Sequence, residues 1–166
     1  MLKSSMCVVV MACALAACGA VPMPSAGVAP PTAELRTSAS TPVLAGGYKK
    51  LPAPAGAAVY FVSLKNGDLV ASPLLVQFGL RGLGVAPAGV EKDNTGHHHL
   101  LIDVAELDVN NALPMTDTIR HFGGGQTEVR VELKPGVHTL QLLLADHNHI
   151  PHHPPVISER ITVTVK

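Results

Sequence analysis

The chain has 166 residues, and its 12 basic and 12 acidic side chains give a formal charge of zero. It has no basic stripe and no row of aromatic side chains, and only 3% of its residues are aromatic. A basic stripe and a row of aromatic side chains are typical of nucleic-acid-binding proteins, so nucleic acid is not an expected partner of this chain.

Residues 1–17 are predicted to be a signal peptide. Lys3 precedes an apolar run, residues 7–17, that is shorter than the roughly 20 residues needed to span a bilayer. The run ends in Leu15-Ala16-Ala17-Cys18, the residue order at which bacterial lipoproteins are cleaved and lipidated. We therefore expect Cys18 to carry a lipid. The alternative is an ordinary secretory signal in which Cys18 is incidental. Gly19 in place of aspartate favours an outer-membrane lipoprotein facing the periplasm.

Residues 18–56 are predicted to be the lipidated cysteine and a flexible linker. The stretch is rich in proline, alanine, glycine and serine, and such a composition cannot bury enough apolar surface to offset its ordering entropy. The other two cysteines, Cys7 and Cys13, would leave with the signal peptide. The mature domain would then have neither a disulfide nor a thiolate metal ligand.

Residues 57–166 are predicted to form one domain, an immunoglobulin-like antiparallel β-sandwich. Residues 57–64 form a β-rich run, and apolar residues recur with the period of a strand within 74–80, 97–104, 127–133, 140–144 and 161–165. Turns rich in glycine, proline and asparagine separate these runs, and no long stretch has the period of a helix.

All nine histidines fall between His97 and His153, and short histidine-rich tracts indicate metal binding. In a strand over 97–104, His97 and His99 lie on one face, while His98 points toward the core with Leu100. The other histidines can join them only if segment 105–120 crosses the sandwich once more, because that crossing reverses all later strands. We predict the crossing. It leaves His138 at the opposite end in a structural role.

The predicted metal ligands are His97, His99, His121 and one of His147 or His149. Asp103 and Asp146 are predicted to orient the ligand histidines through hydrogen bonds, without binding the metal themselves. An all-nitrogen site suits Zn(II) or Cu(II), and its affinity should fall as the pH drops through the region near 6.5. The alternative is that the histidines only brace loops through hydrogen bonds.

Three long segments resemble the bacterial family called domain of unknown function 4399. They contain the runs Gly-His-His-His-Leu-Leu-Ile-Asp and His-Phe-Gly-Gly-Gly-Gln-Thr-Glu, and they span residues 87–103, 121–128 and 136–160. The resemblance covers residues 57–165. It implies an exported and often lipid-anchored protein, in which the segment starting at His121 forms one unit with the histidine triplet. It implies no activity.

The sequence therefore predicts an envelope domain that binds Zn or Cu in a non-catalytic accessory role, attached to the membrane by its lipid. A structural or protein-interaction module of the envelope, with a protein partner and no metal, is the alternative. A small metalloenzyme, with three histidines and an open coordination position, is the third possibility.

Overall fold

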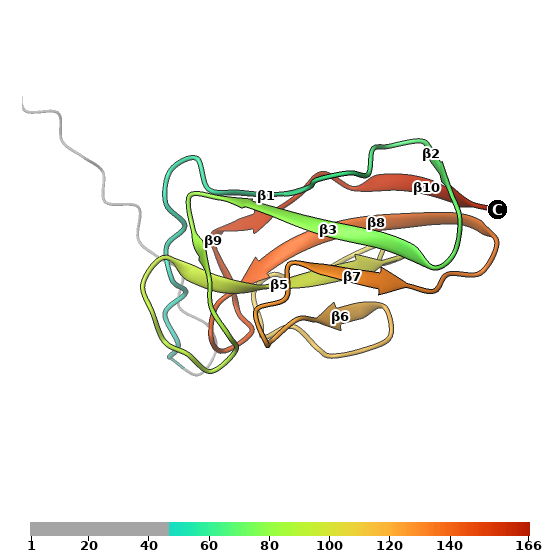
Figure 1. Ribbon diagram of the computed structural model, residues 1–166. Coiled ribbons are helices and arrows are strands. Elements are labelled where there is room, and N and C mark those ends of the chain that lie inside the picture. The colour runs from blue at the N-terminus through green and yellow to red at the C-terminus, as the bar shows by residue number, and fades with distance from the viewer. Residues whose placement is uncertain (1–46) are drawn as a thin grey trace, which may run out of the picture. The chain divides into compact units, whose positions relative to one another are not determined.

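A computed structural model describes residues 47–166, which form an all-β domain (Figure 1). The predicted signal peptide, the predicted lipidation at Cys18 and most of the predicted linker lie outside these residues. Among residues 47–166 no helix is long and apolar enough to cross a membrane. The strands are β1 (Ala58–Phe61), β2 (Asp68–Val70), β3 (Leu74–Arg81), β4 (Gly84–Val85), β5 (Thr95–Ile102), β6 (Ile119–His121), β7 (Glu128–Val131), β8 (Gly136–Ala145), β9 (Pro151–Ile157) and β10 (Ile161–Val165).

Two sheets pack together, which confirms the predicted β-sandwich (Figure 1). The small sheet has the order β1-β3-β7, and β8 lies at the centre of the large sheet. One edge of β8 pairs with β5, and the other edge pairs first with β10 and then with β9. The pairing is antiparallel except at β2–β10 and β4–β5, which are parallel.

The core lies between the sheets and follows the predicted alternation. Val76 and Phe78 of the small sheet pack with Leu100, Leu142 and Val163 of the large sheet. A second apolar cluster lies on the outer face of the large sheet, where segment 103–118 covers Leu101, Leu143 and Ala145. The central strands β5 and β8 are therefore buried on both faces.

The directions of the strands bring the histidines to one end of the domain. The chain leaves β5 at the far end and returns in β6, which pairs antiparallel with β5 and places His121 opposite His99. The end of β8 lies opposite the start of β5, with Ala145 beside His97. His138, near the start of β8, pairs with Val163 of β10. The predicted reversal of the chain within residues 105–120 is thus confirmed.

Contacts with the domain begin at Tyr48, earlier than the predicted boundary at Ala57. His153 of β9 donates its backbone N–H to the carbonyl of Leu51, and Ala53 donates its own to the carbonyl of His153. Lys50 is 2% exposed. Residues 48–53 lie inside the predicted linker and have no strand or helix period, so the sequence gave no signal for these long-range contacts.

Strand β9 was missed by the sequence analysis because three of its residues are proline. Proline cannot donate a hydrogen bond to a sheet, and it is tolerated on edge strands. Among the strands β9 pairs only with β8, at Leu143, Leu144 and Ala145, and its other backbone pairing is a single bridge between His153 and Pro52. The pair His152-His153 consequently lies in a strand.

Gly96 allows β5 to approach β8 closely just before the histidine triplet. A Cβ at this position would lie 2.4 Å from the carbonyl oxygen of Ala145 and 3.0 Å from the side chain of Leu144. The backbone oxygen belongs to the central strand and cannot move aside.

We expect Gly96→Ala to lower the free energy of unfolding by about 1–3 kcal/mol, the usual effect of overpacking a close-packed interior. Gly84→Ala is the matched control, because the atom nearest to its Cβ would be a methyl carbon of Thr95, at 3.4 Å. Urea denaturation of both variants measures the difference. Equal stability of the two variants would contradict this account of Gly96.

Candidate metal centre

Strand β5 places His97 and His99 side by side on the outer face of the large sheet. Their ring centres are 4.8 Å apart, and both side chains are fully buried. His98 points the opposite way, into the core, with its ring centre 5.2 Å from that of Phe78. The period of the strand predicted this division of the triplet.

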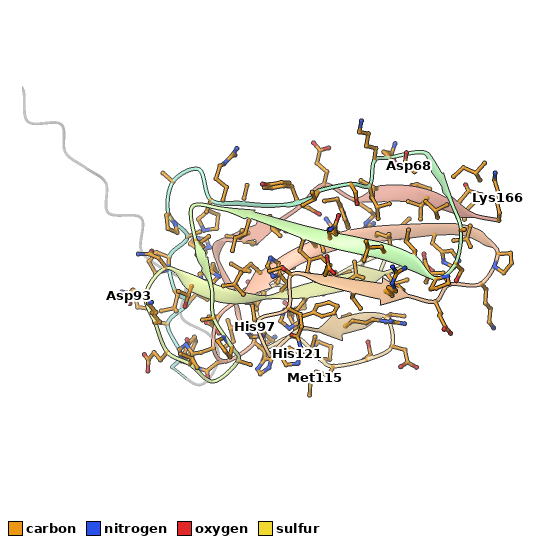
Figure 2. The ribbon with its side chains drawn as sticks, viewed as in Figure 1. Asp68, Asp93, His97, Met115, His121 and Lys166 are labelled. Atoms are coloured by element: carbon orange, nitrogen blue, oxygen red, sulfur yellow. The ribbon has the colours of Figure 1, made fainter. Side chains whose placement is uncertain are left out.

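Strand β6 adds His121 to the pair. The ring centre of His121 lies 4.8 Å from that of His97 and 5.3 Å from that of His99. Figure 2 shows His97 and His121 at the same end of the domain. Gly123 makes room for the His121 ring, because a Cβ on Gly123 would lie 2.2 Å from its Cε1 atom and 2.5 Å from its Nε2 atom.

His149 approaches from the turn that follows β8. Its ring centre is 4.9 Å from that of His97, and its Nε2 atom is 3.1 Å from Nε2 of His121. The backbone of His149 has a φ of +64°, a left-handed conformation that is uncommon for residues other than glycine. Such conformations persist where the surroundings enforce them, and they cluster at functional sites.

Asp146 holds the His149 turn through its backbone. The side chain of Asp146 is fully buried, and its Oδ1 atom accepts hydrogen bonds from the backbone N–H groups of Asn148 and Ile150. The N–H of His149 donates to the carbonyl of Asp146 at 3.0 Å. The predicted supporting role of Asp146 therefore takes a different form, because its carboxylate shapes the turn and does not bond an imidazole ring.

Nitrogen atoms of His97, His99 and His121 lie within 4.8 Å of one another, so these three residues could hold a metal ion. His149 is farther from His99, with 6.1 Å between ring centres, but close to the other two. Zinc–nitrogen bonds of about 2.0–2.1 Å would place the ion roughly 3.2 Å from each ring centre, and a tetrahedral site would then separate ring centres by about 5.2 Å. The six separations among the four rings range from 4.7 to 6.1 Å.

The ring nitrogens of His97 and His99 are buried without a hydrogen-bond partner. Buried polar groups in folded proteins are almost always paired, and leaving one unpaired costs about 1–3 kcal/mol. Protein groups therefore leave most of the bonding capacity of these four nitrogens unused. A cation that accepts their lone pairs would satisfy one nitrogen of each ring.

Burial favours the neutral form of the imidazoles of His97, His99 and His121. It lowers the pKa of His97 to about 3 and that of His99 to about 2, and the neighbouring imidazoles add to both shifts. The pKa of His121 is lowered in the same way, by burial and by His149. Neutral imidazole is the form that binds a metal. Protons therefore compete for these nitrogens at lower pH than the value near 6.5 inferred from the sequence.

One side of the cluster is closed and the other is open to solvent. The apolar cluster under segment 103–118 includes Leu101 and Ala145, the direct neighbours of the site in β5 and β8. His121 and His149 are only half-buried. An open depression reaches His121 and is lined by Met115, Thr116, Asp117, Ile119, Arg120 and His121. A small ion therefore has a path to the two outer imidazoles.

Two residues of the predicted site make their contacts elsewhere. Asp103 lies at the far end of β5, where its carboxylate bonds Nδ1 of His138 at 2.7 Å and the N–H of Thr139. These contacts do not support the cluster, because Asp103 follows the last residue of the strand that begins beside His97. His147 bonds the side chain of Asn148 at 2.9 Å. Of the two alternatives His147 and His149, the structure brings His149 to the cluster.

The sequence analysis also missed His152, which is 1% exposed and has no hydrogen-bond partner on either ring nitrogen. Burial lowers its pKa, and the backbone of Leu144 and Thr95 partly opposes that change. No sequence signal distinguished His152 from His153, because the prolines around them hid the strand. The role of Gly123 has no sequence signal either, because its lack of a side chain matters only where the His121 ring lies against it.

The fold and the cluster together define a β-sandwich domain with a histidine group that could hold a metal. The chain belongs to the family described as domain of unknown function (DUF4399), whose model matches residues 76–166. The match confirms the resemblance seen in the sequence. It begins within β3 and so covers less than the predicted span of 57–165. All four clustered histidines lie inside it.

No curated protein and no solved structure matches the chain. The pairing of His121 with His99, and the hydrogen bond from Phe122 N–H to the carbonyl of His98, confirm that the segment starting at His121 forms one unit with the triplet.

We expect the metal-free protein to lose stability as the pH falls. An imidazole of the unfolded chain binds a proton near pH 6.5, whereas folded His97 binds one only near pH 3. The unfolded state therefore holds more protons between these values, and stability declines progressively as pH drops from about 6.5 toward 3.

Urea denaturation in the presence of a chelator, at several values between pH 7 and 4, measures this slope. NMR titration of the imidazole resonances checks its origin. A midpoint near 6.5 for His97 and His99 in the folded, metal-free protein would contradict the prediction.

Proposed function

We propose that this domain binds a divalent transition-metal ion through His97, His99, His121 and His149. The observation that carries the proposal is the convergence of four imidazoles from three different segments, of which His97 and His99 have buried ring nitrogens without a hydrogen-bond partner. Hydrophobic packing alone would favour apolar side chains at these positions, because unpaired nitrogens in an interior are destabilising.

Zinc is the ion that best fits the ligand set. Four imidazoles at nearly tetrahedral separations suit Zn(II), whereas Cu(II) prefers a square or tetragonal arrangement. The described residues contain no cysteine, and their one methionine, Met115, is 70% exposed. This part of the chain therefore has no thiolate ligand and no methionine cluster of the kind that favours Cu(I).

The proposed role is that of an accessory that holds or buffers the metal. Catalytic zinc sites keep one coordination position open for water or substrate, and His149 fills that position here. Two of the four ligands are half-buried, which favours exchange of the ion with solvent. A metalloenzyme would need His149 to leave the ion during turnover.

We further propose that the domain works in the bacterial envelope. This rests on the predicted signal peptide and on the lipobox-like residues before Cys18. The lipid would hold the domain on the periplasmic side of the outer membrane, within reach of an envelope protein partner. Such a location fits a protein that captures metal ions outside the cytoplasm.

A metal-free structural module is the second candidate. The 3.1 Å separation of the two Nε2 atoms of His121 and His149 also suits a direct hydrogen bond between a donor and an acceptor imidazole. In that case the cluster would brace the loops at this end of the domain.

The two candidate functions predict different zinc affinities for single-residue variants. We expect His97→Ala to weaken Zn(II) binding by more than about 100-fold, since loss of a mere supporting residue already costs 10- to 100-fold. His149→Ala should weaken binding too, and His147→Ala is the matched control from the same turn, with unchanged affinity. Isothermal titration calorimetry on untagged protein measures all three.

Elemental analysis of the same untagged protein shows whether an ion is retained on purification. Equal affinity of the His97→Ala variant and the parent, or no zinc binding by the parent, would favour the metal-free module.

Gly123 offers a test that leaves every ligand in place. We expect Gly123→Ala to weaken zinc binding about tenfold or more, because its Cβ would displace the His121 ring. Gly124→Ala is the control, since its Cβ would meet only the flexible side chain of Gln126. Titration calorimetry compares the two. Equal affinities would show that the position of His121 is not critical for binding.

A further inference from the structure

The residues that lead into the domain, Tyr48–Ala53, form a strap beside the proposed metal site. The strap is bonded to β9 through the backbone of Leu51 and Ala53. Two of its side chains, Tyr48 and Lys50, bond to the segments that carry or flank His149. Neither contact is part of the metal ligand set.

Tyr48 bonds to the residue that shapes the His149 turn. Its hydroxyl donates to Oδ2 of Asp146 at 3.0 Å, while the other oxygen of that carboxylate holds the N–H groups of Asn148 and Ile150. Burial raises the pKa of Tyr48, so its hydroxyl stays protonated and able to donate. A hydrogen bond to a charged acceptor is worth about 1.5–3 kcal/mol when it is well formed.

Lys50 bonds to segment 109–113, which contacts the same turn. Its ammonium group is bonded to the carbonyl of Val109 and, at 3.3 Å, to the side-chain oxygen of Asn110. A few residues later, Leu113 donates its N–H to the carbonyl of His149 at 2.9 Å. Because a buried ammonium needs oxygen partners, the position of Lys50 and that of segment 109–113 depend on each other.

We propose that the strap Tyr48–Ala53 is a latch whose docking is coupled to occupancy of the metal site. The docked strap holds the turn that presents His149, and a bound ion holds His149 and thereby the partners of the strap. This inference rests on the proposed function and adds the regulation of that site.

The coupling follows from the geometry of His149. Its left-handed backbone is unfavourable by itself, so the turn needs outside support in the absence of a ligand. The ion supplies that support from inside and the strap supplies it from outside. Two partners that stabilise the same conformation each raise the affinity of the other by the same factor.

The coupling has a consequence for the tether. The strap lies within the predicted linker, close to the domain, so its release would add six extended residues, about 20 Å, to the length of free chain. Gain or loss of the ion would then change how far the domain can reach from the predicted lipid anchor. Metal occupancy would be reported to a neighbouring partner in this way.

The first test compares the zinc affinity of the full chain with that of Tyr48→Phe, which loses only the hydroxyl. We expect the affinity to fall about three- to tenfold, as a modest share of one hydrogen bond to a carboxylate. Tyr60→Phe is the matched control, since Tyr60 is 47% exposed on β1 and should leave the affinity unchanged. Titration calorimetry with Zn(II) gives all three values.

The second test measures the reverse effect by amide hydrogen exchange. Zinc should slow exchange at Ala53 and His153, whose N–H groups join the strap to β9. The same addition should have no effect on these amides in His149→Ala, although that variant retains three of the proposed ligands. A strap that is merely structural would exchange at the same rate with and without zinc.

The outcomes separate the two proposals. If the parent protein binds no zinc, the proposed function is overturned and the latch with it. If zinc binds at His97 but Tyr48→Phe binds it equally well and the strap amides do not respond, the latch is overturned and the metal site stands.

Discussion

The register of β5 against its two neighbours is the constraint on which the site depends. β8 pairs with β5 so that Ala145 lies opposite His97, and β6 pairs with the other edge so that His121 lies opposite His99. A shift of one residue in either ladder would turn these side chains to the opposite face. The register is fixed by the core, because the same shift would move Leu100 and Leu142, which are fully buried, out of the space between the two sheets.

The imidazoles make the interior at this end of the domain polar, and the residues around the cluster hold these side chains in place. Apolar side chains close one side of the cluster, and the turn held by Asp146 presents His149 on the side that is open to solvent. The opposite end uses a histidine in a different way. His138 has both ring nitrogens bonded, to Asp103 and to the carbonyl of Lys134, and the bond to Asp103 raises its pKa. A fully bonded imidazole has no lone pair for a metal, which separates His138 from the cluster.

The three histidines of the triplet also differ in their surroundings. His98 faces the core, and burial lowers its pKa to about 4, with the backbone of Gln126 partly opposing the change. Neither of its ring nitrogens has a hydrogen-bond partner of ordinary geometry, but Phe78 packs against it where a second ligand would be needed. Three adjacent histidines thus have two environments, and the alternation of a strand is the reason.

The sequence by itself determined the β-sandwich, the face of each triplet histidine and the place of His138, because these follow from a period of two and from strand directions. Tertiary structure alone decided that His149 rather than His147 joins the cluster, since a bonded turn with a left-handed residue has no periodic signal. It also decided that Asp103 lies far from the site and that Tyr48 and Lys50 lie beside it. Those contacts join residues that are far apart in the chain, and their composition gives no sign of the partner they meet.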